Sequence, residues 1–280
     1  MLPSRLAVLA AALLWSSAGA AIKLSELSAW QLSAGRSLVA AAVLFIALPS
    51  ARRLPSRKAW LAAVAYAATV TLFVIANKLT TAANAIFLQD TAPLWVLLLS
   101  PLLLRERATR SELFAAPVFL LGLGMFFLDQ LAPGQLLGNG LALLSGVAFA
   151  LAIMGLRSVS GEGAAVLVAG NAIAGAVAFL PALSGPAPTA QDVGIVLFLG
   201  VFQLALSYGL FQWGLRRTPA IEASLLILLE PVLNPVWTFL LAGERPGPWA
   251  LVGGAIILLA TAWRTVAAAL TTRASVSPSS

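Results

Sequence analysis

The chain has 280 residues, of which 60% are hydrophobic and only 10% are charged, and its mean hydropathy is +0.96. Soluble domains carry about 25% charged residues, so this composition excludes an ordinary soluble protein and predicts an all-α polytopic membrane protein. The net charge of +7 does not indicate nucleic-acid binding, because the basic residues lie in short segments between long apolar runs. The chain has no Cys and no His, which excludes disulfides, thiol catalysis and imidazole chemistry.

Ten apolar stretches follow one another along the chain, separated by short connections rich in Pro and Gly. A helix needs about 20 mainly apolar residues to cross a bilayer, and each stretch comes close to that length. We expect the last residues, 269–280, to form a disordered tail because they are rich in Ser. In chain order, the expected spans are residues 6–22, 30–48, 59–77, 82–104, 113–128, 136–156, 164–180, 193–213, 220–241 and 249–263.

The basic residues lie mostly on one side of these spans. With the N-terminus in the cytoplasm, only Lys23, Lys78 and Arg245 are outside, and Arg36 falls within a span. The other thirteen of the 17 Lys and Arg residues are then inside. This asymmetry follows the positive-inside rule and predicts that both termini are cytoplasmic.

A gapless internal repeat relates the fourth and ninth spans. The stretch "LTTAANAIFLQDTAPLWVLLLSPLLLRER", from residue 79, aligns with "RTPAIEASLLILLEPVLNPVWTFLLAGER", from residue 217. Pro93 then matches Pro231, and Glu106 matches Glu244. The repeat unit has five spans, so the second copy begins on the opposite side of the membrane. The sequence therefore predicts two inverted five-helix repeats around a central cavity, residues 1–133 and 134–268, as in secondary transporters.

The first twenty residues allow a second interpretation, a cleavable signal peptide. Arg5 would form its charged region, and "AGA" at residues 18–20 would form its cleavage site. Cleavage would leave nine spans and break the repeat, so the repeat favours a retained first span.

The repeated motifs also carry a family resemblance. In each half a small residue pair, an apolar run and a proline lead to "LLLRER" or "LLAGER", and the Gly-rich "LGLGMFF" and "LVGGAIILLA" follow. This pattern resembles the EamA type of the drug/metabolite transporter superfamily, and it covers essentially all ten spans. Among its members the chain is most similar to bacterial amino-acid exporters of the YddG type. The resemblance implies a ten-helix carrier of the bacterial inner membrane that exports small metabolites, often amino acids, without a cofactor.

Two carboxylates lie deep inside spans, where charge is costly and usually faces a cavity or a partner. Asp90 and Glu230 lie ten residues beyond Thr80 and Ala220, about 15 Å into the membrane at the helical rise of about 1.5 Å per residue. We expect both to line the cavity and to hold a substrate ammonium or a proton. The alternative is structural, with each acid bonding backbone groups freed by a nearby proline or pairing with Arg36.

Two basic residues also lie in or at the end of spans. Arg36 lies six residues past Trp30, about 9 Å from the outer face. It could bind a substrate carboxylate, pair with an acid or extend to the headgroups. Lys78 ends the third span, where it either faces the mouth of the cavity or lies at the membrane interface.

Uncharged polar and aromatic side chains complete the predicted site. Tyr208 and Gln212 share one face of the eighth span, and Trp15 and Trp95 lie deeper than the Trp residues at span ends. Helix–helix hydrogen bonding and simple packing are the alternative roles for these side chains. The further cavity candidates of this kind are Asn77, Asn171, Gln203 and Asn234.

Pro93 and Pro231 are expected to kink the fourth and ninth spans, because each removes a backbone donor and clashes with the preceding turn. Matching kinks would bend both spans around the cavity and act as hinges. The sequence thus predicts a secondary transporter that exports amino acids, including aromatic ones, by alternating access, with a proton as an allowed coupling ion. Its partners are the lipid bilayer and the solute, with no nucleic acid and no metal, in a monomer or weak dimer.

Two other classes stay open at this point. A channel or facilitator could instead carry a drug, a nucleoside or a sugar derivative. An intramembrane enzyme is the least favoured class, because no H-E-x-x-H or G-x-S-x-G motif is present.

Overall fold

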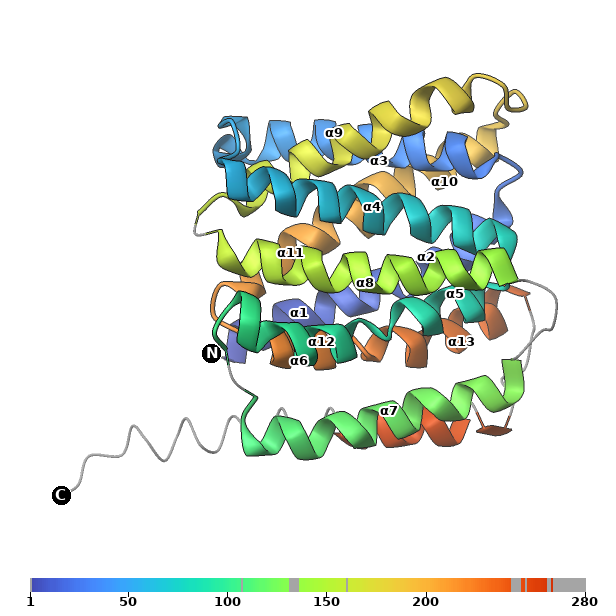
Figure 1. The fold of residues 1–280 in the computed structure, drawn as a ribbon. Helices are drawn as coiled ribbons and strands as arrows, with labels where there is room; N and C mark the ends of the chain where they lie inside the picture. The colour runs from blue at the N-terminus through green and yellow to red at the C-terminus, as the bar shows by residue number, and fades with distance from the viewer. Residues whose placement is uncertain are drawn as a thin grey trace.

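The structure is a computed structural model that describes residues 2–106, 108–130, 136–159, 161–242, 248–249, 251–260 and 263. These residues form helices and short connections, with no β-strand among them. Figure 1 shows the helices lying side by side in one bundle, with their axes running between its two ends. The elements are α1 Leu2–Trp15, α2 Ala18–Leu24, α3 Ala29–Ala47, η1 Pro49–Arg52, α4 Arg57–Leu79, α5 Ala82–Gln89, α6 Ala92–Leu103, α7 Arg110–Gln130, α8 Leu136–Ser158, α9 Gly163–Ala182, α10 Ala190–Phe198, η2 Leu199–Leu206, α11 Ser207–Leu215, α12 Ala220–Leu226 and α13 Leu229–Ala242.

The predicted fold class, a polytopic α-helical membrane protein, is confirmed. Within the described residues, seven helices or broken helix pairs are long and apolar enough to cross a membrane. The other three expected spans fall on α7, on α12 with α13 and on a helix over residues 251–260, none of which reaches this length and hydropathy within the described residues, so seven of the ten expected spans are confirmed. The long apolar helices are Leu2–Leu24, Ala29–Ala47, Arg57–Leu79, Asn84–Leu103, Leu136–Ser158, Gly163–Ala182 and Ala190–Leu215.

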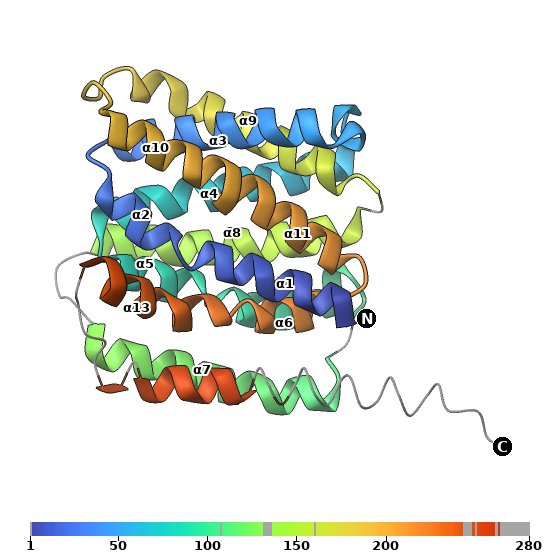
Figure 2. The ribbon, with the colours of Figure 1, turned by 180° about the vertical axis from the view of Figure 1, so that it is seen from behind.

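The two ends of the bundle can be told apart by where the helices begin. At the N-terminal end, the start of α1 packs on the end of α11, where Gly214 lies against the backbone of Ser4. At the opposite end, called the far end here, Gly138 at the start of α8 lies against Thr80, where α4 has ended. The first helix of the second half therefore begins at the other end from α1, as the inverted repeat predicts (Figure 2).

Small residues let the helices approach one another closely. The closing helices α7 and 251–260 meet at Gly122, where a Cβ would lie only 2.7 Å from Ile257 Cγ1 and 3.0 Å from the carbonyl oxygen of Gly253. Figures 1 and 2 both place this pair along one edge of the bundle. The Gly-rich closing motifs of the two halves thus pack against each other, as small-residue helix interfaces do in membranes.

Within the described residues, three spans have a non-helical break near their middle. The fourth span breaks at Asp90–Thr91, between α5 and α6, and the ninth breaks at 227–228, between α12 and α13. Pro93 and Pro231 then lie in the first turn of α6 and of α13, where a missing N–H costs little.

The third interruption was not predicted. The first span breaks at residues 16–17, between α1 and α2. Here the hydroxyls of Ser16 and Ser17 donate to the carbonyls of Leu13 and Leu14, at 2.7 and 2.8 Å. Such serine bonds to the preceding turn bend helices, which explains a break without proline.

Candidate functional site

A small cavity lies in the middle of the bundle, where the broken spans meet the second, third, sixth and eighth spans. Its volume is about 20 Å³, room for roughly one water molecule. Both halves of the chain contribute to its wall, and five of the predicted candidates are among the lining residues. The lining comprises Trp15, Arg36, Val70, Phe73, Gln89, Phe149, Gln203, Leu204, Tyr208 and Glu230.

Arg36 supplies the positive charge of this cavity. Its side chain is buried, with 1% of the residue exposed, so it does not extend to the headgroups. Nη1 donates to Gln203 Oε1 at 3.1 Å and Nη2 to the Val70 carbonyl oxygen at 2.5 Å, whereas Nε has no partner within the described chain. The ion pairs of the described residues do not include Arg36. Of the three roles that the sequence allowed, pairing with an acid and snorkelling are not observed.

The partner of Arg36 is held by an unusual stretch of helix. Gln203 lies in η2, a π-helix that interrupts the eighth span between α10 and α11. Its backbone carbonyl accepts a hydrogen bond from the Ser207 hydroxyl. At Gly200 a Cβ would lie 2.9 Å from the Arg36 carbonyl oxygen, so η2 and α3 are in close contact. Segments of π-helix occur frequently at functional sites.

Aromatic rings form another part of the wall. Trp15 and Tyr66 each lie with their ring centroids 4.6 Å from that of Tyr208, and the two tyrosines meet edge to face at 82°. Phe149 packs against Trp15 at 5.6 Å. Asn171 Nδ2 donates to the Tyr66 hydroxyl oxygen at 2.9 Å. This predicted candidate therefore contacts the aromatic cluster but does not itself line the cavity. The arrangement offers flat apolar surfaces with hydroxyl groups at their edges.

The two predicted acids lie at the two matching helix breaks. Asp90 ends α5 and Glu230 is the second residue of α13, and both are buried. Their carboxyl groups are close enough to repel each other when both are charged. Glu230 lines the cavity, whereas Asp90 lies beside it and is not part of the lining.

Among the described residues, the side chains of the two acids make no hydrogen bond to the backbone at the breaks. At the break in the fourth span, the Thr91 hydroxyl donates to the Leu88 carbonyl at 2.7 Å, and the Asp90 amide donates to the Ile86 carbonyl at 2.8 Å. Asp90 Oδ2 has no hydrogen-bond partner among the described residues. At the break in the ninth span, the Glu230 amide donates to the Ile227 carbonyl at 2.8 Å. The side chains of both acids are thus left available for another role.

The remaining candidates lie away from the cavity lining. Lys78 Nζ donates to the Ser25 carbonyl at 2.6 Å, at the far end of the bundle. Gln212 packs tightly against Gly163 at the start of α9. Asn234 lies beside Gly19, and the indole of Trp95 packs against the apolar core. Asn77 is fully buried at the end of α4.

Several lining residues were not expected from the sequence. Gln89 donates from Nε2 to Ser145 Oγ at 2.8 Å, and Ser145 in turn donates to the Thr69 carbonyl at 3.0 Å. Tyr66, which packs on Tyr208 without lining the cavity, was also not expected, although it is one of only two tyrosines in the chain. The apolar residues Val70, Phe73, Phe149 and Leu204 carried no such signal.

Both halves of the chain match one family of known proteins. The sequence profile of the EamA-like transporter family matches residues 3–128 and again residues 136–265. The chain belongs to the EamA-like transporter family. The two matches correspond to the two repeats, so the cavity lies between the two EamA-like units. Glu244 and Arg245, the second copy of the "ER" motif, lie outside the described residues.

Two further similarities agree with this family. An uncharacterized transporter of Archaeoglobus fulgidus is 25% identical over 173 residues, which is 60% of this chain and 62% of that relative. The match therefore spans less than two thirds of the relative's length. A solved crystal structure superposes with a TM-score of 0.74 at 21% identity, over 92% of this chain and 95% of the other. At that identity the superposition supports the fold alone.

Proposed function

We propose that this EamA-like transporter is a secondary carrier for small zwitterionic solutes, most of all amino acids with aromatic side chains. In this proposal it works by alternating access in a bacterial inner membrane, with both termini cytoplasmic, and in the direction of export. The observation that carries the proposal is a buried guanidinium, that of Arg36, which has no carboxylate partner among the described residues and lines a central cavity.

A substrate carboxylate would complete this site. Burying an unpaired ion costs several kcal/mol, so the site favours a ligand that brings the opposite charge. Arg36 Nε and the Trp15 indole N–H are buried lining donors that lack acceptors among the described residues. One carboxylate has enough lone pairs to accept from both donors, and the pairing with arginine would be charge-assisted.

The acid pair would receive the other end of a zwitterion. Glu230 lines the same cavity as Arg36, and Asp90 is close enough for its charge to repel that of Glu230. A substrate ammonium near these two carboxyls would relieve their repulsion. The rings of Trp15 and Tyr208 would then cover an apolar or aromatic side chain.

The size of the cavity favours a carrier over a channel. A volume of about 20 Å³ holds roughly one water and no amino acid, so the side chains around it must separate before a solute can enter. The interrupted fourth and ninth spans provide places where the helices can bend. This fits the alternating access expected of inverted-repeat transporters.

Counterflow in proteoliposomes tests the proposal. The purified protein should exchange labelled phenylalanine for a panel of amino acids with saturable kinetics. It should exchange phenethylamine, which lacks the carboxylate, much more weakly. Arg36→Gln should lower the apparent affinity for the amino acids while leaving that for the amine unchanged. Arg53→Gln, which removes an exposed arginine, is the matched control. Absence of saturable exchange for every amino acid, or equal effects of Arg36→Gln on both ligands, would contradict the proposal.

A further inference from the structure

Two ion pairs join the two repeats at the N-terminal end of the bundle. Arg5 Nε lies 2.7 Å from Glu222 Oε1, and its Nη2 donates to Glu222 Oε2 at 3.3 Å. Arg157 Nε lies 2.8 Å from Glu106 Oε1. The side chains of the first pair are about nine-tenths buried, and those of the second are about three-quarters buried. Each pair joins a residue of 3–128 to a residue of 136–265.

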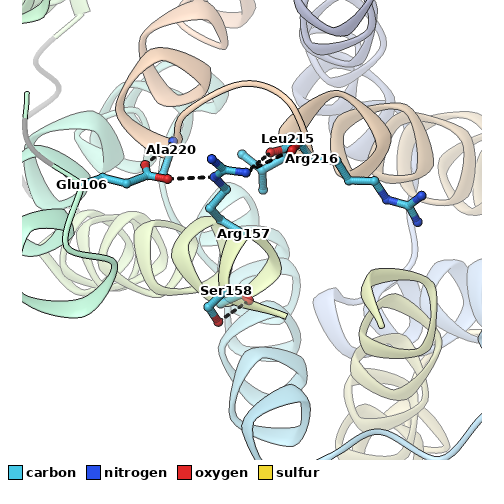
Figure 3. Close-up of polar contacts among 7 residues, drawn as sticks. Glu106, Arg157, Ser158, Leu215, Arg216 and Ala220 are labelled. Atoms are coloured by element: carbon cyan, nitrogen blue, oxygen red, sulfur yellow. Dashed lines mark hydrogen bonds and ion pairs between the residues drawn. The ribbon is translucent and has the colours of Figure 1, made fainter. Parts of the chain in front are cut away.

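Glu106 and Arg157 are the centre of a larger latch, drawn in Figure 3. Glu106 Oε2 accepts a hydrogen bond from the amide of Ala220, the first residue of α12, at 3.0 Å. Arg157 Nη1 donates to the carbonyls of Arg216 at 3.1 Å and Leu215 at 3.4 Å. A carboxylate at a helix start and a cation at helix-end carbonyls both match the free groups there. The connection after α6 is thereby fastened to the connection between α11 and α12.

The far end is closed in a different way. Asp192 Oδ1 accepts from Ser25 Oγ at 2.6 Å and from the Glu26 amide at 3.1 Å, so among the described residues its donors from the first repeat are neutral. The two lysines there act within the first repeat, where Lys23 donates to the Thr80 carbonyl at 2.8 Å and Lys78 to the Ser25 carbonyl. Among the described residues, no ion pair joins the two repeats at this end.

The residues of the two ion pairs lie on helices, or beside helices, that lead directly to the cavity. Arg5 begins α1, which ends at Trp15, and Arg157 lies two turns beyond Phe149 on α8. Glu222 lies in the first turn of α12, just before the break and Glu230. A solute could pass from the cavity to the N-terminal end only if these elements separated, which would pull both ion pairs apart.

We infer that Glu106–Arg157 and Arg5–Glu222 are the gate of the N-terminal end, and that they hold it shut while the weaker far end opens first. This inference rests on the proposed carrier function. The hydrogen bonds of the two ion pairs and those of Asp192 are all charge-assisted, because each includes a carboxylate. Each pair at the N-terminal end also joins two opposite charges, whereas the donors to Asp192 are neutral, so the N-terminal end has the added Coulombic attraction and resists opening more. Removing a gate charge therefore shifts the protein toward the state that is open at the N-terminal end.

The absence of cysteine gives a clean test in the full-length protein. Ser224→Cys on α12 and Ser33→Cys on α3 place single thiols one turn in from the N-terminal end and from the far end, and both serines are fully buried. A membrane-impermeant maleimide is added to vesicles of either orientation, without any substrate. Glu106→Gln should raise the labelling rate of the first thiol on the order of tenfold, the size expected for one charged hydrogen bond, and lower that of the second. Asp192→Asn should change the two rates in the opposite directions.

Other variants keep the inference falsifiable. Glu222→Gln should give the same shift as Glu106→Gln, and it replaces that variant if Glu106→Gln does not reach the membrane. Glu106→Asp keeps the charge and should restore most of the closed behaviour. Arg53→Gln removes an exposed charge at the same end and is the control. Labelling of Ser224→Cys that stays at the control rate in both gate variants would overturn the inference.

The labelling readout separates this inference from the proposed function, because it needs no ligand. If the amino-acid panel gives no exchange but the labelling shifts as expected, the gate stands and the proposed substrate class fails. If exchange occurs but the labelling does not shift, the substrate class stands and the gate fails.

Discussion

The fourth and ninth spans align with each other without gaps, yet they contribute differently to the lining of the cavity. Both break near the middle, at Asp90–Thr91 and at 227–228, and each has an aligned proline in the turn after its break. The acids do not align, because Ala92 matches Glu230. As a result only Glu230 lines the cavity, and Asp90 lies beside it. The repeat has preserved the backbone interruption, whereas the charged groups have diverged between the two halves.

The largest expected effect tests the difference between the acids. Glu230→Gln should raise the KM for amino-acid exchange more than Asp90→Asn does, because only Glu230 lines the cavity. Loss of one charge-assisted contact is worth about 1.5–3 kcal/mol, or roughly a tenfold to hundredfold change in affinity. Counterflow over a range of concentrations measures both variants. A larger effect of Asp90→Asn would reverse the assignment, and normal exchange by Glu230→Gln would leave that acid with a structural role.

The second prediction concerns α8, which packs on the break in the fourth span. A Cβ at Gly146 on α8 would lie 2.8 and 2.9 Å from the carbonyl oxygens of Gln89 and Leu88, which cannot move aside easily. Gly146→Ala should therefore destabilise the protein by about 1–3 kcal/mol. Gly19→Ala is the comparison, because a Cβ there meets only side-chain atoms. Thermal unfolding in detergent should give a lower Tm for Gly146→Ala than for Gly19→Ala, and equal Tm values would contradict this prediction.

A third, smaller effect separates the two breaks by their local hydrogen bonds. Thr91 donates to the Leu88 carbonyl, whereas the aligned residue of the second half is Leu229, which has no hydroxyl. Thr91→Val should cost about 1 kcal/mol of stability, the usual value of one hydrogen bond. Leu229→Val leaves the hydrogen bonds of the second break untouched and serves as the control. The same unfolding measurement applies, and a Tm for Thr91→Val at or above that of the control would show that the bond does not matter.

The smallest effect on stability is expected at the repeated prolines. Because Pro93 and Pro231 lie in first turns, replacing either by Ala should change stability by no more than about 0.5 kcal/mol. If these breaks are hinges, the rate of exchange should nevertheless fall, with little change in KM. Rapid counterflow at saturating substrate measures that rate. Unchanged rates in both variants would remove the hinge role while leaving the helix breaks intact.

Some parts of the site could be predicted from the sequence because they depend on the free-energy cost of placing a particular residue, such as a charge or a proline, in an apolar helix. A charge inside an apolar run needs a cavity or a partner, and this cost alone identifies Arg36 and Glu230 as candidates. A proline in a span interrupts the helix, which located two of the three breaks. Gln203 and Tyr208 were found in the same way, as polar groups within a span.

Other parts depend on contacts between distant segments and could not be predicted. Arg157 was counted only as one of the inside charges, but it pairs with Glu106, which lies 51 residues earlier in the chain. Tyr66 enters the site only because Asn171 and Tyr208 meet it from other helices. The placement of Gln203 depends on a π-helix, whose hydrogen bonds no periodicity in the sequence indicates.

The sequence by itself determined the class of the protein, the helical spans and their inverted repetition. These follow from the solvent, since hydrocarbon requires apolar helices of fixed length and an odd repeat must invert. The tertiary structure alone decided which buried groups meet at the cavity and which close the ends. Those choices depend on helix rotation and close approach, and they are set by packing between segments far apart in the chain. Arg36 illustrates the division, because hydropathy marks it as costly, and only the packed bundle shows that its partners are neutral oxygens.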